Sequence, residues 1–307
     1  MEQSMFFKNL TSPQNKVDII LDTDAYNEVD DQFAIAYMLK SEDKLNIKGI
    51  CAAPFHNKIS NGPADGMKKS YEEIFKLLKL AEREDLNNIV FSGSESYLLD
   101  EKTAVDSPAA DYMANLANNY SSENPLYIVA IGAITNVASA LLKNPKMVEN
   151  TVVVWLGGHG IEFNLPASEF NMVQDIAAAR VVINSGVPFV QLPCRGVVEQ
   201  LTISKSELEY WLIGKNPLAT YLAENTIAAA ESYAKGKPWT RVIWDISTIA
   251  WLLNKDGKLF MQDRIINAHI PQYDKLYAEN KDNHFIKYVY HIERDAIIDD
   301  LFRKLCE

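Results

Sequence analysis

Residues 17–37 read V-D-I-I-L-D-T-D-A-Y-N-E-V-D-D-Q-F-A-I-A-Y. The first part is an apolar, β-branched run typical of a buried strand, and the last part has the spacing of a helix. A strand that leads directly into a helix is the unit from which parallel sheets are built. Five carboxylates lie where the two patterns meet: Asp22, Asp24, Glu28, Asp30 and Asp31.

The same alternation of short apolar runs and helical patterns continues along the chain. It predicts strands at residues 17–21, 47–53, 89–92, 126–131, 151–156, 189–192 and 285–290. It predicts helices at residues 31–40, 66–83, 109–120, 134–142, 176–184, 218–235, 242–253 and 294–305, so the chain is mostly helical after residue 203. These elements indicate an α/β fold with an open, mostly parallel, doubly wound (Rossmann-like) sheet and a helical C-terminal portion. Because no repeat or linker interrupts the pattern, we expect residues 1–307 to form a single domain.

Composition narrows the class of function. The formal net charge of −11 argues against a nucleic-acid backbone or an anionic membrane as partner, and favours a small molecule. No apolar run approaches the roughly eighteen residues of a membrane helix, and the first residues lack a signal-peptide pattern, so we expect a cytoplasmic protein. Cys51, Cys194 and Cys306 are scattered, and we expect them to be small buried groups rather than disulfides or metal ligands.

The carboxylates after the first strand lie where open parallel sheets bind ligands, beyond the carboxyl ends of the strands. An EF-hand loop counted from Asp22 is excluded, because Tyr26, Asn27 and Phe33 replace its oxygen ligand, glycine and glutamate. The D-x-D-x-T motif of aspartyl-nucleophile phosphatases matches except that Tyr26 replaces the threonine. A phosphatase therefore stays open as a distant alternative.

Capping of the following helix is a simpler explanation for Asp30 and Asp31. Four aspartates around one strand end nevertheless need a counter-charge, most simply a hard cation such as Ca²⁺, which takes oxygen ligands. Two later segments can add ligands to it. The strand at 126–131 breaks at Gly132, which leaves the carbonyl of Ile131 free, and Asp245 stands at the front of an apolar helix, where it is equally a candidate cap.

Four collinear segments, together spanning residues 17–254, resemble the calcium-dependent nucleoside hydrolase family, which prefers inosine and uridine. L-D-T-D-A-Y-N-E-V-D-D resembles the family's D-x-D…D-D signature with a longer loop, and I-G-A-I-T-N-V-A resembles its G-x-x-T-N turn. W-L-G-G…F-N…A-S-E-F-N resembles its G-G…G-N…A-E-F-N block, and I-W-D-I-S-T-I-A resembles the segment with its last metal aspartate. The resemblance implies a Ca²⁺-dependent N-ribohydrolase that releases base and ribose from nucleosides, and a homodimer or homotetramer.

The resemblance also implies roles for individual residues. Asp24 corresponds to the general base that faces the attacking water, and Asp22 to a group that steadies it. The metal ligands are three carboxylates and one carbonyl: Asp24, Asp31, Asp245 and Ile131. The groups that hold the sugar are Asp30, Asn57, Asn164, Glu169 and Asn171.

Trp244 stands where many members of that family carry a histidine that protonates the leaving base. Purine-selective members share the W-D arrangement, which implies that Trp244 stacks on a purine and raises its proton affinity, although a core position is the usual explanation for a tryptophan in an amphipathic helix. Candidates for a second stacking aromatic are Phe55, Tyr97 and Trp155, and candidates for a substitute acid are His56 and His159.

The chemistry of N-ribosidic cleavage fits an acidic crevice, because positive charge develops on the ribosyl ring and carboxylates stabilise it. Purine salvage is the role that this reaction suggests. Since the family's histidine acid is missing, a non-catalytic protein that binds a nucleoside or sugar on the same scaffold is the alternative hypothesis.

Overall fold

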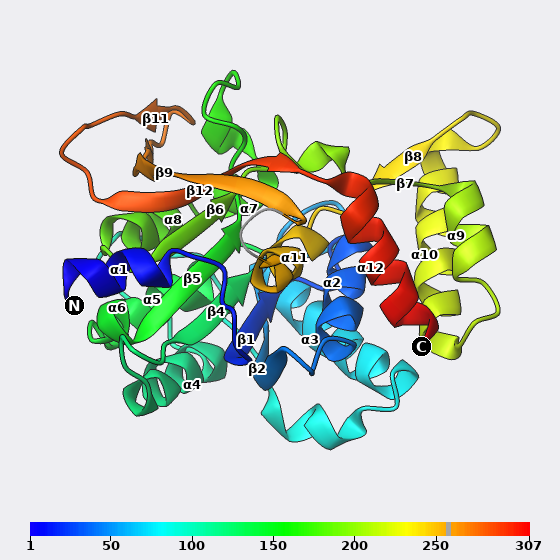
Figure 1. Ribbon diagram of the computed structural model, residues 1–307, viewed down its shortest axis with the longest axis horizontal. Helices are drawn as coiled ribbons and strands as arrows, with labels where there is room; N and C mark the ends of the chain where they lie inside the picture. Colours follow the sequence, from blue (N-terminus) through cyan, green and yellow to red (C-terminus); the bar gives the residue numbers. More distant parts are fainter. Residues whose placement is uncertain (256–258) are drawn as a thin grey trace.

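A computed structural model describes residues 1–255 and 259–307 and has an eight-stranded central sheet in the order β3-β2-β1-β4-β5-β6-β12-β9 (Figure 1). Every neighbouring pair is parallel except β12 and β9. The sheet confirms the open, mostly parallel arrangement expected from the sequence. Its strands are β1 (Val17–Thr23), β2 (Leu45–Ala52), β3 (Val90–Phe91), β4 (Leu126–Ala130), β5 (Thr151–Leu156), β6 (Phe189–Leu192), β9 (Met261–Asn267) and β12 (Phe285–Ile292).

Helices cover both faces of the sheet, as the doubly wound prediction requires (Figure 1). In β1, Ile19 and Leu21 pack into one apolar cluster and Ile20 into the other, because successive side chains of a strand point to opposite faces. The first cluster contains α2 (Asp30–Leu39), α3 (Pro63–Leu80), α10 (Pro217–Ala234), α11 (Ile246–Leu253) and α12 (Arg294–Cys306). The second contains α4 (Pro108–Leu116), α5 (Thr135–Lys143) and α8 (Ile176–Asn184).

The strand order reverses between β1 and β4, since β2 and β3 extend the sheet on one side of β1 and β4 to β6 on the other. At such a switch point the loops diverge and leave a crevice beyond the carboxyl ends of the strands. Asp22 of β1 lies opposite Ala130 of β4, and the backbone N–H of Ile131 donates to the Asp22 carbonyl at 2.8 Å. The residues that follow β1 and β4 are therefore brought together at this crevice.

The C-terminal portion contains more strand than the sequence pattern predicted. The predicted helix at 242–253 begins only at Ile246, because Thr240–Val242 forms strand β8 and pairs antiparallel with β7 (Thr202–Ser204). Strand β9 was not predicted, because it is a half-exposed edge strand and lacks the continuous apolar run of the buried strands. The remaining elements are short: α1 (Gln3–Asn9), α6 (Met147–Asn150), α7 (Phe170–Gln174), α9 (Lys205–Trp211), β10 (Ile270–Pro271) and β11 (Tyr277–Ala278).

Two further predicted helices differ from the observed bounds by at least three residues. Helix α3 begins at Pro63 rather than at residue 66, because proline is well suited to the first helical position. Helix α4 ends at Leu116, and residues 117–119 continue as a short 3₁₀ turn. The predicted bounds of β5, β6 and α8 agree with the structure.

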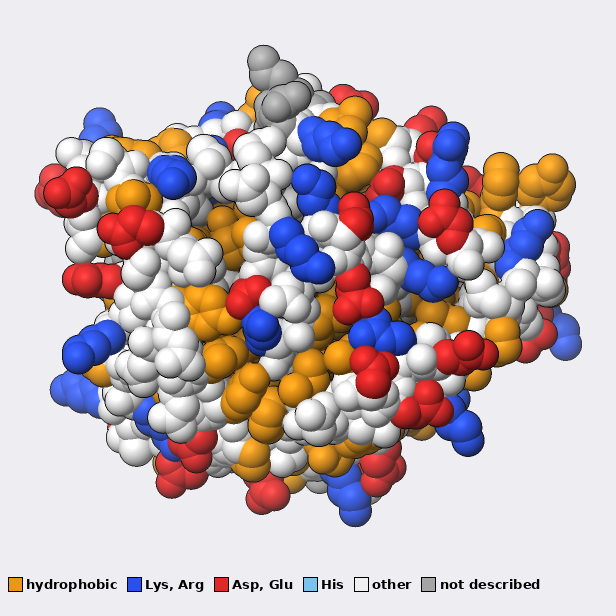
Figure 2. Space-filling model, turned by 60° about the horizontal axis from the view of Figure 1, so that its bottom comes forward, with side chains coloured by type: hydrophobic (Ala, Val, Ile, Leu, Met, Phe, Trp, Pro, Cys, Tyr) orange, Lys and Arg blue, Asp and Glu red, His pale blue; other side chains and the backbone are white. Residues whose placement is uncertain are grey.

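Acidic and basic side chains are interspersed over the face shown in Figure 2, with apolar patches between them. None of the helices within 1–255 and 259–307 is both long and apolar enough to span a bilayer. All three cysteines are free; Cys51 and Cys194 are buried as expected, whereas Cys306 is only partly buried because it lies near the end of the last helix.

Candidate active site

A cavity of about 370 Å³ lies at the switch point, beyond the carboxyl ends of β1, β4, β5 and β6. Its lining is strongly acidic, which is unusual because like charges repel and charged groups are costly to bury. The carboxylates that line it are Asp24, Glu28, Asp30, Asp31, Glu169 and Asp245.

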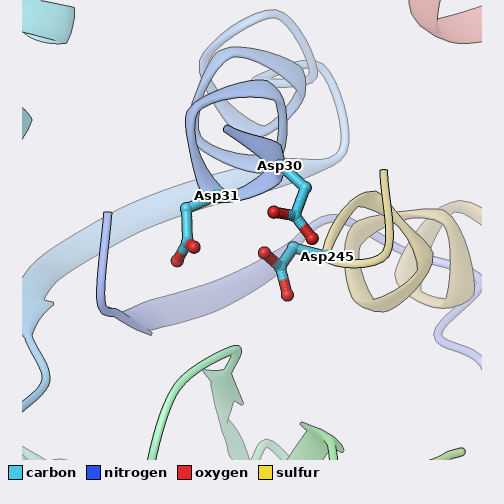
Figure 3. Close-up of side chains that lie close together, drawn as sticks. All are labelled: Asp30, Asp31 and Asp245. Atoms are coloured by element: carbon cyan, nitrogen blue, oxygen red, sulfur yellow. The ribbon is translucent and has the colours of Figure 1, made fainter. Parts of the chain in front are cut away.

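Three of these carboxylates converge from two helices (Figure 3). Asp30 and Asp31 form the first turn of α2, and Asp245 immediately precedes α11. Each offers an oxygen atom, and the three oxygen atoms lie within 4.8 Å of one another. The Asp245 side chain makes no capping hydrogen bond to α11, so capping does not explain its position.

Asp24 follows β1 directly and is 1% exposed. Neither of its carboxylate oxygens has a hydrogen-bond partner among the described residues. Burial, together with the charges of Asp31 and Asp30, raises the pKa of Asp24 well above its usual range. A nearby cation reverses this effect, because it favours the ionised form of the carboxylate.

The surrounding charges compensate this acidic group only in part. Arg241 of β8 forms an ion pair with Glu28. Burial raises the pKa of Asp30, and the positive charge of Arg241 offsets part of this rise. Asp31 and Asp245 have no ion-pair partner within residues 1–255 and 259–307. Burial and the neighbouring aspartates raise the pKa of Asp245, so the group still lacks positive charge.

The predicted ligand set fits a hard divalent cation on its chemistry. All four donors, Asp24, Asp31, Asp245 and the Ile131 carbonyl, are oxygen atoms that line one cavity, and oxygen ligands suit Ca²⁺ or Mg²⁺ rather than softer metals. The Ile131 carbonyl accepts one hydrogen bond, from Asn171 Nδ2 at 3.1 Å, and a carbonyl has a second lone pair. The clearest sign of this fit is that the buried oxygens of Asp24 have no hydrogen-bond partner in residues 1–255 and 259–307.

Behind this group, Asp22 is held by a buried amide. Asn136 Nδ2 donates to Asp22 Oδ1 at 2.8 Å and to the carbonyl of Ala52 at 3.1 Å, while its Oδ1 accepts from the backbone N–H of Ser94 at 2.8 Å. Burial raises the pKa of Asp22 to about 7. Asn136 therefore ties the ends of β1 and β2 to the loop after β3.

Glu169 and Asn171 lie on the side of the cavity formed by the loops after β5 and β6. Glu169 caps α7 and accepts from the backbone N–H groups of Gly158, Asn171 and Met172 at 2.8–3.0 Å. Asn171 Nδ2 bridges the carbonyls of Ile131 and Leu156. Both side chains are thus fixed before any ligand binds.

Comparison with known proteins identifies the family. The inosine-uridine preferring nucleoside hydrolase profile matches residues 19–277. This chain belongs to that family. It is 29% identical over 263 residues to the pyrimidine-specific ribonucleoside hydrolase RihA of Escherichia coli O127:H6, an alignment that covers 78% of this chain and 80% of RihA.

Solved structures share the fold of this nucleoside hydrolase at lower identity. The plant nucleoside hydrolase PpNRh1 superposes with a TM-score of 0.74 at 21% identity, covering 94% of this chain and 99% of that one. A purine-preferring ribonucleoside hydrolase from Gardnerella vaginalis gives 0.65 at 18% identity, covering 94% and 98%. The relatives are N-ribohydrolases, and the chain is accordingly a nucleoside hydrolase.

Two of the predicted sugar ligands do not line the cavity of this nucleoside hydrolase. Asn57 Nδ2 donates instead to Asn27 Oδ1 at 2.6 Å, and Asn27 is the residue of that pair that reaches the cavity. Asn164 is exposed in the loop between β5 and α7. The other predicted catalytic, metal-binding and sugar-binding residues, including Trp244, border the cavity, and Asp22 lies behind it.

The aromatic side chains of the cavity differ from those expected. Phe55 and Trp155 are fully buried, Tyr97 donates to Gln174, and none of the three lines the cavity. Phe170 lines it instead, together with the half-buried Trp244. Phe170, rather than any of the three candidates, is thus the second aromatic ring at the cavity, because the candidates were chosen near strand ends without knowing which way their side chains point.

The two histidines that are candidates for the acid, His56 and His159, differ in whether they reach the cavity. His56 is exposed and does not reach the cavity, whereas His159 borders it. Burial and the charge of Arg195 lower the pKa of His159 to about 4. The imidazole is therefore neutral near pH 7, where it is a hydrogen-bonding group rather than a proton donor.

Phe170, Cys194 and Arg195 line the cavity, and the sequence did not predict a role in the site for any of them. Cys194 and Arg195 lie in the loop that follows β6. The rule that ligands bind beyond strand ends applies to this loop as it does to β1, and would have indicated Arg195. Phe170 lies inside the A-S-E-F-N block itself.

Proposed function

We propose that this nucleoside hydrolase is Ca²⁺-dependent and prefers purine nucleosides, which it cleaves at the N-glycosidic bond to give free base and ribose. The observation that carries the proposal is the buried acidic group at the switch point of the sheet, in which neither oxygen of Asp24 has a hydrogen-bond partner within the described part of the chain. Such a group needs a cation, and a cleaved ribosyl ring needs nearby negative charge.

The cation would be held by Asp24, Asp31, Asp245 and the Ile131 carbonyl. When bound, it supplies the positive charge that lowers the pKa of a neighbouring water and orients vicinal sugar hydroxyls. Asp24 accepts the proton of the attacking water, for which its unpaired oxygens are available. The water oxygen bonds to C1′, and the C1′–N bond breaks with its electron pair passing to the base.

The sugar would be held by side chains that are already fixed. Asp30, Glu169 and Asn171 line the cavity and offer directional partners for hydroxyl groups. Positioning a reactant in this way lowers the entropic part of the barrier. Asn57 and Asn164 are not part of this proposal, because they lie away from the cavity.

The base would lie against Trp244 and Phe170, the two apolar aromatic rings of the cavity. Stacking favours the larger fused ring of a purine and raises its affinity for the proton that it takes from solvent. RihA is pyrimidine-specific and the Gardnerella protein is purine-preferring, so similar proteins act on both classes of base. The proposed preference of this chain for purines rests on its own aromatic side chains.

For the cellular role, we propose purine salvage in the cytoplasm by a homodimer or homotetramer. Light scattering on the purified protein measures the number of chains directly. A monomer that retains full activity would contradict the oligomeric part of the proposal.

The test of the proposed function is base release from inosine, guanosine, adenosine, uridine and cytidine, with Ca²⁺ and after chelation. We expect purines to be cleaved faster, and chelation to abolish cleavage until Ca²⁺ is restored. Faster cleavage of pyrimidines would overturn the stacking role of Trp244 but keep the hydrolase. Ligand binding without any cleavage would identify a non-catalytic binding protein, and Mg²⁺-dependent release of phosphate from monoesters would identify a phosphatase.

A further inference from the structure

The wall of the active-site cavity that follows β1 presents mainly hydrogen-bond acceptors. Its residues between positions 24 and 31 are Asp24, Asn27, Glu28, Asp30 and Asp31. An ionised carboxylate accepts hydrogen bonds and donates none, whereas the amide of Asn27 contains a donor, Nδ2. Within the part of the chain that the structure describes, Asn27 is therefore the only side-chain donor on this wall.

The orientation of the Asn27 amide is fixed by two consecutive hydrogen bonds. The backbone N–H of Ile59, which can only donate, bonds to Asn57 Oδ1 at 3.0 Å and so identifies that atom as the oxygen. Asn57 Nδ2 then donates to Asn27 Oδ1 at 2.6 Å. Asn27 Nδ2 has no acceptor among residues 1–255 and 259–307, so it is the polar atom that Asn27 offers to a ligand.

The loop that carries Asn27 connects the acidic group to the segment that carries Trp244. The Asn27 N–H donates to the Asp24 carbonyl at 2.7 Å and closes a tight turn directly after β1. The next residue, Glu28, forms an ion pair with Arg241, which shortly precedes Trp244 in the chain. Asn27 and Trp244 therefore line neighbouring parts of one cavity.

The chemistry of a nucleoside decides which of its atoms can pair with Asn27, and this step rests on the proposed function. Each sugar hydroxyl has a proton to donate, so it can pair with any carboxylate of this wall. The ring nitrogens N3 and N7 of a purine only accept, so a carboxylate repels them and an amide N–H binds them. For a base stacked on Trp244, the side-chain donor that this wall supplies is Asn27 Nδ2.

We propose that Asn27 recognises the purine by donating a hydrogen bond from Nδ2 to a ring nitrogen, N3 or N7, and that Asn57 positions the Asn27 amide. When the C1′–N bond breaks, its electron pair passes to the base, and the negative charge that develops on the ring strengthens this hydrogen bond. Asn57, which the sequence predicted as a sugar ligand, thus acts through Asn27 rather than on the substrate.

Purine analogues that lack one ring nitrogen test the hydrogen bond. Adenosine, 3-deazaadenosine and 7-deazaadenosine are compared by competition against inosine, which gives an affinity for each even where an analogue is cleaved slowly. We expect Asn27→Ala to weaken adenosine binding by about fivefold or more, since a hydrogen bond in the cavity is lost. One of the two analogues should change by less than about twofold, because it already lacks the accepting nitrogen, and its identity distinguishes N3 from N7.

A second variant tests the positioning role of Asn57 without changing the residue that lines the cavity. In Asn57→Asp the carboxylate still accepts from the Ile59 N–H but cannot donate to Asn27, so the Asn27 amide should turn and present Oδ1 to the cavity. We expect the same loss for adenosine, and the same insensitive analogue, as in Asn27→Ala. Asn61→Asp is the matched control, because it introduces the same charge at an exposed position of the same loop and should leave all three affinities unchanged.

Equal weakening of all three ligands in Asn27→Ala, or no weakening of any, would overturn the inference while the proposed function stands. Wild-type affinities in Asn57→Asp would overturn the positioning role. If inosine is not cleaved, the proposed function fails, and calorimetry with Ca²⁺ present measures the same affinities directly. In that case, weaker binding of adenosine in Asn27→Ala with one analogue unaffected supports the inference, and any other pattern overturns it.

Discussion

Two buried aspartates at the same edge of the sheet behave in opposite ways. Asp175 caps α8 and accepts three hydrogen bonds, from the N–H groups of Leu98 and Ala178 at 2.9 Å and from the Thr135 hydroxyl at 2.8 Å. Asp24 is 1% exposed and accepts none at either oxygen among the described residues. A buried carboxylate whose oxygens accept hydrogen bonds stabilises the fold, whereas a buried carboxylate without hydrogen-bond partners is available to bind a ligand.

The largest expected effect comes from removing the charge of Asp24. In Asp24→Asn the amide neither accepts the proton of the attacking water nor balances the cation, so kcat/KM for inosine should fall by about 10² to 10⁴. The free energy of unfolding of the chelated protein should not fall, because one unpaired buried charge is gone. Base release and urea unfolding measure the two quantities. Near-normal turnover in this variant would break the distinction between the two aspartates.

The opposite result is expected at Asp175. Asp175→Ala leaves two N–H groups and one hydroxyl without their acceptor, so the free energy of unfolding should fall by about 2–3 kcal/mol. The folded fraction should keep its kcat, because Asp175 does not line the cavity. Urea unfolding and base release check both points. A loss of kcat with unchanged stability would assign Asp175 to the chemistry instead.

A smaller effect should separate Trp244 from a tryptophan with no role in binding. Trp244→Ala removes one stacking face, so kcat/KM for purine nucleosides should fall about tenfold and that for pyrimidines by less. Trp211→Ala is the control, because Trp211 is 47% exposed in α9 and does not line the active-site cavity. Equal losses of kcat/KM for purine and pyrimidine nucleosides in Trp244→Ala would show that Trp244 only packs against its neighbours and does not stack on the base.

The smallest effect concerns the pH dependence of stability at His159. Its pKa in the folded protein is lowered to about 4, so between pH 6.5 and 4 the unfolded chain binds more protons and stability falls as the pH falls. From pH 6.5 to 5.5 this costs about 1 kcal/mol, and His159→Gln should remove that slope. His291→Gln is the control, because His291 pairs with Glu293 near the surface. An unchanged slope in His159→Gln, measured by urea unfolding at each pH, would show that the buried imidazole contributes nothing.

The sequence predicted the parts of the fold that are buried on both sides. Strands β5 and β6 are almost entirely apolar because helices cover both of their faces, and their predicted bounds agree with the structure. Strand β9 did not show this pattern, since an edge strand exposes part of its surface and carries polar residues. The periodicity of apolar residues therefore could not predict a strand that is partly exposed at the edge of the sheet.

The residues of the active site were likewise predicted only in part from the sequence. The acidic residues after β1 were recognisable because clustered carboxylates need a physical explanation wherever they lie. Phe170 and Arg195 were not, because their place in the cavity depends on how the loops after β5 and β6 lie relative to each other. The choice between Phe55 and Phe170 likewise needed side-chain directions that a single sequence does not contain.

The most direct test of the central claim is a calorimetric titration of the chelated protein with Ca²⁺. The unpaired carboxylates should bind one ion per chain in the wild-type protein, and Asp245→Asn should weaken that binding strongly. Asp282→Asn, which changes an exposed aspartate, should bind Ca²⁺ as the wild type does. Unchanged binding in Asp245→Asn, or base release from nucleosides with no bound cation, would contradict the account.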